Sequence, residues 1–297
     1  MTSSGLPRDA GPDGARVVAM LRTLAELTSD EAGAQRVAWT GVWQKARAFL
    51  REQLQGLPVT VRTDAAGNQW VTDHNNNTVL VFSAAQLAMT GTNEQMPVVT
   101  ITSSAFNGPL GLVFDKSGNL WVANNGGVPG ANNSTSAVGT TIVEFSKASL
   151  PTVPTSGMLT PMLSPMITLT DDGKGSIQGP WELAFDASGN LWSSNSGTPF
   201  TLVEFSQSML AASGMPTPMT TISPTTVGGT SSLNETNGLC FDNAGNLAAT
   251  NATAPNGSVP FFKAPLKSGM IVPTTFFVGM TTTLNAPAGC NFGPLIM

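Results

Sequence analysis

A fourfold internal repeat constrains the fold of this chain more than any other feature. Each copy contains Asp-x-x-Gly-Asn, followed by a short run that ends in Asp or Asn. Self-similarity of this kind indicates a row of structural units, each of which packs against its neighbours. The four copies align without gaps and are TDAAGNQWVTD (63–73), FDKSGNLWVAN (114–124), FDASGNLWSSN (185–195) and FDNAGNLAATN (241–251).

Each repeat is predicted to form four short strands. In the second repeat these strands are GLVFD (111–115), NLWVAN (119–124), TIVEFS (141–146) and MITLT (166–170). Gly118 can supply the positive φ of a tight hairpin between the first two strands. Alternation along the second strand places Leu120 and Val122 on one face and Trp121 on the other. A sheet with two apolar faces needs a neighbour on each side, and radial repetition of such sheets gives a β-propeller.

The predicted fold is therefore mainly β, a β-propeller of about four four-stranded blades with a short N-terminal helical pair. The ring is either complete, incomplete or truncated from a larger propeller. The Pro-rich segment 149–165 is predicted to be an irregular loop. The predicted domains are a disordered tail (1–14), a helical segment (15–62), four repeats (about 63–107, 108–178, 179–235 and 236–285) and a closing strand (286–297).

The repeats resemble those of the NHL and streptogramin-lyase-like β-propellers. The resemblance is carried by units of the form GNLWVAN (118–124) followed by TIVEFS (141–146), and it covers about residues 63–297. It implies the propeller fold. Propellers of this kind include binding proteins, scaffolds and a few enzymes, so the resemblance implies no single activity.

The first 62 residues differ from the rest, because every arginine of the chain lies at or before Arg62. Apolar residues at helical spacing predict helices at 15–28 and 42–54, followed by a strand at 57–64. Three segments, GAQRVAWT (33–40), ARAFLREQL (46–54) and VRTDAAGN (61–68), resemble the N-terminus of N-carbamoyl amino-acid hydrolases of the zinc-dependent M20 family. A catalytic zinc usually takes three protein ligands, often histidines. The chain has one histidine, so this resemblance implies a fragment of that fold without its active site.

Two segments compete for one place in the first blade. VTVRT (59–63) stands where its first strand is expected, and AGCNFG (288–293) has the pattern of the same strand at the other end of the chain. We predict a fusion at the shared DAAGN sequence. The alternative is a divergent first blade preceded by an accessory helical pair.

The polar residues at the repeat ends are the first candidates for ligand binding. In a closed propeller they would form a ring near one mouth of the channel and could bind a sugar, a peptide or a hard cation. The alternative is that they shape turns. Trp70, Trp121 and Trp192 stand at one repeat position and fit packing between blades better than an aromatic binding platform. Glu182 lies in the strand that precedes the third repeat motif and is expected to face the channel. The candidate ligand-binding residues are Asp73, Asn124, Asn195, Asn251, Glu182, Trp70, Trp121 and Trp192.

Four further side chains carry expectations of their own. His74, the one ordinary general-base candidate, lies beside three asparagines and is predicted to be an exposed loop residue. Glu144 and Glu204 recur within VEFS and are predicted to face solvent. Cys240 and Cys290 are offset by one position in the repeat, so alternation predicts two free buried thiols. No catalytic or metal-binding residue is assigned.

Composition restricts the partners. The net charge of −5 and pI of about 4.8 argue against nucleic acid. No apolar run has the length of a membrane span, and residues 1–15 lack a secretory pattern, so the chain as written is predicted to be cytoplasmic. Propeller relatives of this Thr- and Asn-rich composition are secreted or lie at the cell surface.

The predicted function is a non-enzymatic binding or scaffold module for a small molecule, a glycan or a protein, without a cofactor. One alternative is a metal-dependent enzyme at the channel mouth, streptogramin-lyase-like or lactonase-like, with a calcium or magnesium ion in the channel. Another is a zinc amidohydrolase fragment that lacks its active site.

Overall fold

The computed structural model describes residues 22–30, 33–34, 42, 45–46, 66–88, 96–126, 138–252 and 257–278. It divides into two compact units. The larger unit comprises residues 67–83 and 97–295, and the smaller one comprises residues 1–66, 84–96 and 296–297.

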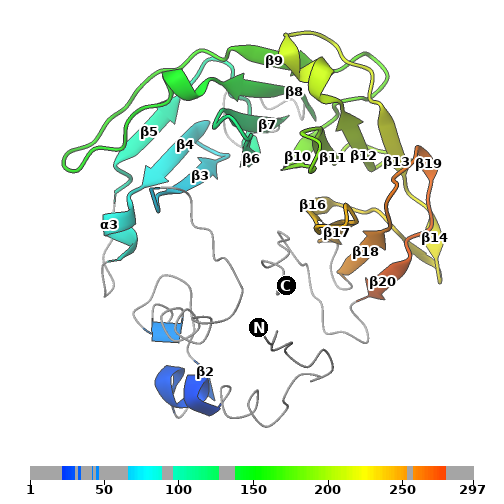
Figure 1. The fold of residues 1–297 in the computed structure, drawn as a ribbon, viewed down its shortest axis with the longest axis horizontal. Helices are drawn as coiled ribbons and strands as arrows, with labels where there is room; N and C mark the ends of the chain where they lie inside the picture. The colour runs from blue at the N-terminus through cyan, green and yellow to red at the C-terminus, as the bar shows by residue number, and fades with distance from the viewer. Residues whose placement is uncertain are drawn as a thin grey trace, which may run out of the picture. The chain divides into compact units, whose positions relative to one another are not determined.

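The larger unit consists of successive antiparallel sheets, which we call blades 1 to 4 (Figure 1). Blade 1 contains β3 (Gln69–Asp73), β4 (Thr78–Phe82) and β5 (Val99–Thr102). Blade 2 contains β6 (Pro109–Phe114), β7 (Leu120–Gly126), β8 (Val138–Phe145) and β9 (Ile167–Thr170). Blade 3 contains β10 (Pro180–Phe185), β11 (Leu191–Asn195), β12 (Thr201–Phe205) and β13 (Thr220–Ser223). Blade 4 contains β16 (Thr236–Phe241), β17 (Leu247–Asn251), β18 (Ser258–Phe262) and β20 (Thr275–Val278).

Neighbouring blades meet near the first strand of each. The leading strands of blades 2 to 4 are β6, β10 and β16, and β6 contacts β10 while β10 contacts β16; in blade 1, β3 contacts β6. The predicted propeller of four-stranded blades is thus confirmed for blades 2 to 4. Blade 1 shows three strands among the described residues, and its β3 corresponds to β7 of blade 2. The two segments that compete for the missing strand, 59–63 and 288–293, lie outside the described residues, as does the closing strand at 286–297.

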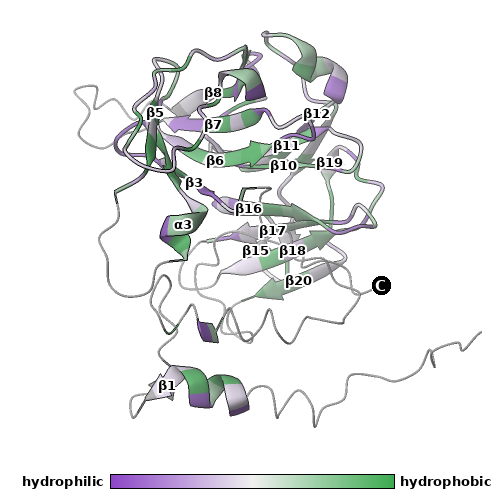
Figure 2. Cartoon of the chain, turned by 60° about the vertical axis from the view of Figure 1, so that its left-hand side comes forward, coloured by the Kyte–Doolittle hydropathy of each residue, from purple (hydrophilic) through white to green (hydrophobic). Residues whose placement is uncertain are grey.

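The hydrophobic core lies between the blades. Leu120 and Val122 belong to the cluster shared with blade 1, whereas Trp121 and Ala123 belong to the cluster shared with blade 3. A third cluster joins blades 3 and 4. The predicted alternation of β7 is therefore confirmed, and both faces of this strand are buried against a neighbouring blade. Figure 2 shows the leading strands β6 and β16 among the hydrophobic elements.

The Asp-x-x-Gly-Asn motif forms the hairpin that joins the first two strands of a blade. In blade 2, Asp115 Oδ1 accepts the backbone N–H groups of Ser117 and Asn119, and Gly118 has φ +86°. Asn119 Oδ1 then accepts the N–H of Lys147 after the third strand. Blades 3 and 4 repeat these bonds with Asp186 and Asn190, and with Asp242 and Asn246.

The outer strand of a blade pairs in parallel with a segment from the next repeat. Leu159 N–H donates to Val98 O and Gly214 N–H donates to Thr168 O, so blades 1 and 2 are extended at their outer edges. In blade 3 the added strand is β19 (Gly269–Met270), which pairs with β13. The Pro-rich segment 149–165 forms no strand, as predicted, although isolated bridges at Leu159 and Met162 pair it with blade 1.

The remaining elements of both units are short. The 3-10 helices η1 (Lys147–Ser149) and η2 (Gln207–Ala211) follow the third strands of blades 2 and 3, and β14 (Thr226–Val227) pairs with β15 (Thr230–Ser231). In the smaller unit, residues 22–28 are helical, β1 (Ser29–Asp30) pairs with β2 (Gly33–Ala34), and α3 spans Ala84–Leu87.

Part of the predicted N-terminal helical pair is visible. Residues 42 and 45–46 of the second predicted helix are helical, while the predicted tail at 1–14 and the strand at 57–64 lie outside the described residues. Among the helices that the structure describes, none is long and apolar enough to cross a membrane.

The prediction of free thiols is wrong, because Cys240 is disulfide-bonded. Cys240 is only partly buried on β16. Alternation fixes the face of a side chain within one strand, but it does not fix how a residue on another segment approaches that face. The strand also carries a register shift between Thr236 and Gly238, which interrupts strict alternation. Cys290 lies outside the described residues.

Candidate functional site

Asn124, the last residue of the second repeat motif, is fully buried and links three parts of blade 2. Its Nδ2 donates to Ala105 O and to Thr141 Oγ1, both at 2.8 Å. Its Oδ1 accepts the N–H of Asn107 at 3.0 Å. The side chain therefore joins the second strand to the third strand and to the segment that leads into the blade.

Asn195 and Asn251 repeat this arrangement in blades 3 and 4. Asn195 donates to Thr201 Oγ1 at 3.1 Å, and Asn251 donates to Ser258 Oγ at 2.8 Å. Asp73 of blade 1 differs, because it is only partly buried and accepts bonds from its neighbour Asn76. Each of these candidate residues bonds within its own blade, which is the turn-shaping role considered above. Their part in ligand binding stays a prediction.

The three repeated tryptophans lie between blades. Trp70 packs edge-on against Phe114 of blade 2, with ring centroids 5.3 Å apart. Trp121 packs in the same manner against Phe185 at 6.2 Å, and Trp192 against Phe241 at 5.7 Å. Each tryptophan thus contacts the phenylalanine that opens the next repeat motif, and this contact contributes packing between blades.

His74 joins blade 1 to blade 2. Its Nε2 lies 3.0 Å from Gly126 O, and because a carbonyl only accepts, Nε2 carries the proton of this bond. Asn77 Oδ1, three residues later, accepts the N–H of Gly108 at 2.7 Å. His74 lies in a turn, as predicted, but it is partly buried rather than exposed.

Glu182 lies on β10, the leading strand of blade 3. The pairing of β10 with β11 shifts register between Pro180 and Leu183, so Glu182 sits in a bulge, a feature that re-aims side chains. Its N–H donates to Ser194 Oγ at 3.1 Å, and Leu183 N–H donates to its Oε1 at 3.3 Å. Burial raises the pKa of Glu182 to about 7, although the bond from Leu183 acts against this shift.

Glu144 and Glu204 are both buried, at 2% and 6% exposure, so the prediction that they face solvent is wrong. Glu144 pairs across the strands with Trp121, and Glu204 pairs with Trp192. A residue beside a tryptophan on the same face must lie in the same covered seam. The signal was present in the sequence, since both faces of these strands are apolar.

Comparisons with known proteins assign neither a family nor an activity. No family model matches the chain, and no curated protein matches it. The solved structures that resemble it include a streptogramin B lyase at 13% identity, covering 74% of this chain and 54% of that one, with a TM-score of 0.41. A gluconolactonase, XC5397 from Xanthomonas campestris, is 15% identical over 77% of this chain and 63% of that one, with a TM-score of 0.40.

A luciferin-regenerating enzyme is 14% identical over 71% of this chain and 63% of that one, with a TM-score of 0.38. The chain thus spans between half and two thirds of the length of these proteins. Identities and TM-scores this low assign no activity, and the fold rests on the sheets and their packing. No comparison supports the M20-like resemblance of the N-terminal segment.

Proposed function

We propose that this chain is a β-propeller binding module that takes a small ligand against its leading strands, with Glu182 as the residue that holds it. The observation that carries this proposal is a partly buried carboxyl in a bulge of β10, whose pKa is raised to about 7 by its burial. A ligand that donates hydrogen bonds to this carboxyl would offset the cost of its burial.

The neighbouring leading strands carry glycine at the repeat position of this residue. Register places Gly111 of β6 and Gly238 of β16 at the repeat position of Glu182. Neither glycine presents a side chain there, and a Cβ at Gly111 would clash with Trp181 O and come within 2.9 Å of Glu182 Cα, so this glycine allows β6 and β10 to approach closely. Of these three equivalent positions, only the one in blade 3 bears a polar group.

The proposal is tested by a thermal-shift screen of monosaccharides, amines and short peptides, followed by calorimetric titration of the hits. The wild-type protein is compared with Glu182→Gln, and Glu235→Gln serves as a matched control because Glu235 is exposed near the start of β16. We expect at least one ligand to bind the wild type and the control but to bind Glu182→Gln at least ten-fold more weakly. Equal affinity for all three proteins would place the ligand elsewhere.

A metal-dependent enzyme at the channel mouth is the second candidate. The pKa of Glu182 favours it, since an acid that titrates near neutral pH suits general acid–base catalysis. The described residues contain no group of three or more His, Cys, Asp or Glu side chains that could hold a metal ion. These residues do not fit a protein-held metal, so no catalytic step is assigned through one. Stoichiometric calcium or magnesium in dialysed protein, with lactone turnover lost in Glu182→Gln, would favour the enzyme.

A further inference from the structure

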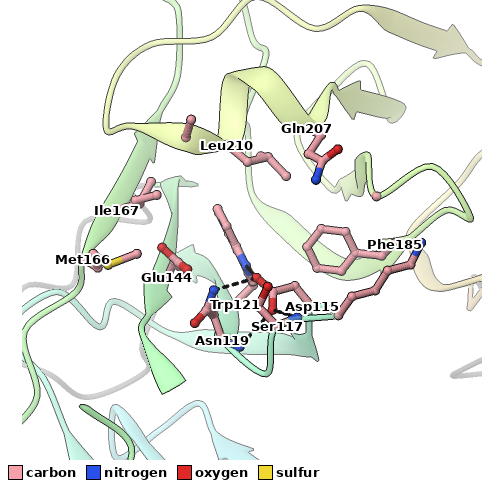
Figure 3. A pocket seen from close by; sticks show the side chains of 13 residues that line it. Asp115, Ser117, Asn119, Trp121, Glu144, Met166, Ile167, Phe185, Gln207 and Leu210 are labelled. Atoms are coloured by element: carbon pink, nitrogen blue, oxygen red, sulfur yellow. Dashed lines mark hydrogen bonds between the residues drawn. The ribbon is translucent and has the colours of Figure 1, made fainter. Parts of the chain in front are cut away.

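A pocket of about 340 Å³ opens between blades 2 and 3, at the end of the blades that carries the Asp-x-x-Gly-Asn hairpins (Figure 3). Blade 2 lines it with its hairpin, the end of β8 and the start of β9. Blade 3 lines it with Phe185 and with η2, which contributes Gln207 and Leu210. This volume lies within the range typical of sites for small organic molecules.

Glu144 lies in the wall of this pocket. Its side chain is 98% buried, and Oε2 has no hydrogen-bond partner among the described residues. A buried carboxylate oxygen without a donor is costly, so its presence indicates a site where something else supplies the donor. Figure 3 shows the carboxyl group on the same wall as Ile167 and Trp121.

The equivalent glutamate of blade 3 provides an internal comparison. Glu204 Oε1 accepts a bond from Asn190 Nδ2 at 2.9 Å, and the Thr220 hydroxyl also donates to this carboxyl. Strand pairing places Thr220 opposite Glu204. The same pairing places Ile167 opposite Glu144. Blade 2 therefore has an apolar side chain in place of Thr220, one of the two donors to Glu204.

The other charged residues of the pocket are already engaged. Asp115 Oδ2 accepts Asn119 Nδ2 at 2.9 Å and Trp121 Nε1 at 3.3 Å, in addition to the hairpin bonds of its Oδ1. Lys116 Nζ donates to Ala187 O at 2.6 Å. Lys116, the cationic side chain among the described residues that line the pocket, therefore does not pair with Glu144. Burial and the negative charge of Asp115 raise the pKa of Glu144 to about 6.

We propose that this pocket binds a small organic cation, an ammonium or amidinium group on an apolar body, with the charged group on Glu144. The cation supplies the charge-assisted donor that Ile167 cannot give, and the body packs against the rings of Trp121 and Phe185 and against Leu210. This site is separate from Glu182, so it stands or falls independently of the function proposed above.

The test is an NMR titration of protein labelled with ¹³C at its methionine methyl groups, at pH 7.5. Met166 lines the pocket and reports binding there, while the exposed Met270 of β19 serves as a distant reference. Benzamidine and benzylamine are the cationic probes, and benzyl alcohol is the neutral probe of similar shape. We expect both cations to shift the Met166 signal in a saturable manner, with at least ten-fold higher affinity than benzyl alcohol.

Two variants separate the role of charge from that of packing. Ile167→Thr places opposite Glu144 the hydroxyl that Glu204 already has, and Glu144→Gln removes the charge; each is expected to weaken benzamidine at least ten-fold. Glu204→Gln, at the same position of blade 3, is expected to leave the affinity unchanged. If Ile167→Thr fails to fold, Glu144→Gln decides alone. Equal binding of benzyl alcohol, undiminished binding to Glu144→Gln, or no saturable shift with any probe would each overturn the proposal.

Discussion

His74 Nε2 donates to Gly126 O across 3.0 Å, and this bond connects the first turn of blade 1 to the end of the second strand of blade 2. Replacing His74 with alanine leaves the Gly126 carbonyl without its donor in a partly buried seam. We expect the free energy of unfolding to fall by about 1 kcal/mol, measured by urea denaturation. Lys267→Ala, at an exposed position outside this seam, is the control. An unchanged midpoint for His74→Ala would show that the bond contributes nothing.

Gly108 lies beside this bond and has φ +62°. A Cβ at this position would come within 2.5 Å of Gly126 O and 2.8 Å of His74 Nε2. Gly157 also has a positive φ, +80°, but nothing lies within 4 Å of its Cβ position. We therefore expect Gly157→Ala to cost about 1 kcal/mol through backbone strain alone. Gly108→Ala should cost clearly more in the same denaturation assay, and equal costs would contradict the close approach of the two blades.

The buried asparagines at the strand ends are expected to matter for stability. Asn195→Ala would remove the donor to Thr201 Oγ1 and the acceptor for Gln178 N–H. Leaving these groups without a partner should cost about 2–3 kcal/mol, measured by chemical denaturation with circular dichroism. Asn76→Ala is a control of the same type, because Asn76 is exposed. If Asn195→Ala lowers the free energy of unfolding no more than the control does, the bonds of Asn195 do not stabilise the fold, and a role in ligand binding is favoured instead.

Glu182 should make stability depend on pH. Its pKa is about 7 in the folded protein, against 4.5 for an unperturbed glutamate, so the folded state binds more protons than the unfolded state between these pH values. The free energy of unfolding should therefore fall as pH rises from about 4.5 to 7, by up to roughly 3 kcal/mol for this group. Thermal melts across this range test the prediction. In Glu182→Gln, the free energy of unfolding should change much less between pH 6 and 7 than in the wild type. Glu144, with a pKa of about 6, contributes less to the pH dependence in this range. An identical pH dependence in the two proteins would contradict the burial of the Glu182 carboxyl.

The sequence predicted the blades because the repeat carries its structure locally. Asp115, Gly118 and Asn119 make the hairpin with bonds inside a few residues, and Trp121 reaches only the start of the next repeat. Because these features stand at the same positions of successive repeats, they can be recognised in the sequence. The same argument shows why Glu144 should have been expected in a seam: it stands beside Trp121 on a strand with two covered faces.

Other features depend on partners outside the repeat motif. Asn124 could bind a ligand or shape a turn by its chemistry alone, and its burial is decided by Ala105 and Thr141. The edge pairing of the Pro-rich segment was missed because proline lacks an N–H. At Pro161 the edge pairing needs only an acceptor, since the N–H of Thr102 donates to Pro161 O. The donor of this pairing comes from Leu159, whose N–H bonds to Val98 O. Cys240 depends likewise on a partner outside its own strand.

The most direct test of the proposed binding module is a ¹³C NMR titration of the glutamate carboxyl carbons, with Glu182→Gln used to assign the signal of Glu182. We expect that signal to titrate near pH 7, because burial raises the pKa of this carboxyl. We also expect the signal to shift when a ligand from the screen is added, because the proposed ligand contacts the carboxyl. A pKa near 4.5, or a signal that does not respond to a ligand that binds, would contradict the assignment of Glu182 as the residue that holds the ligand.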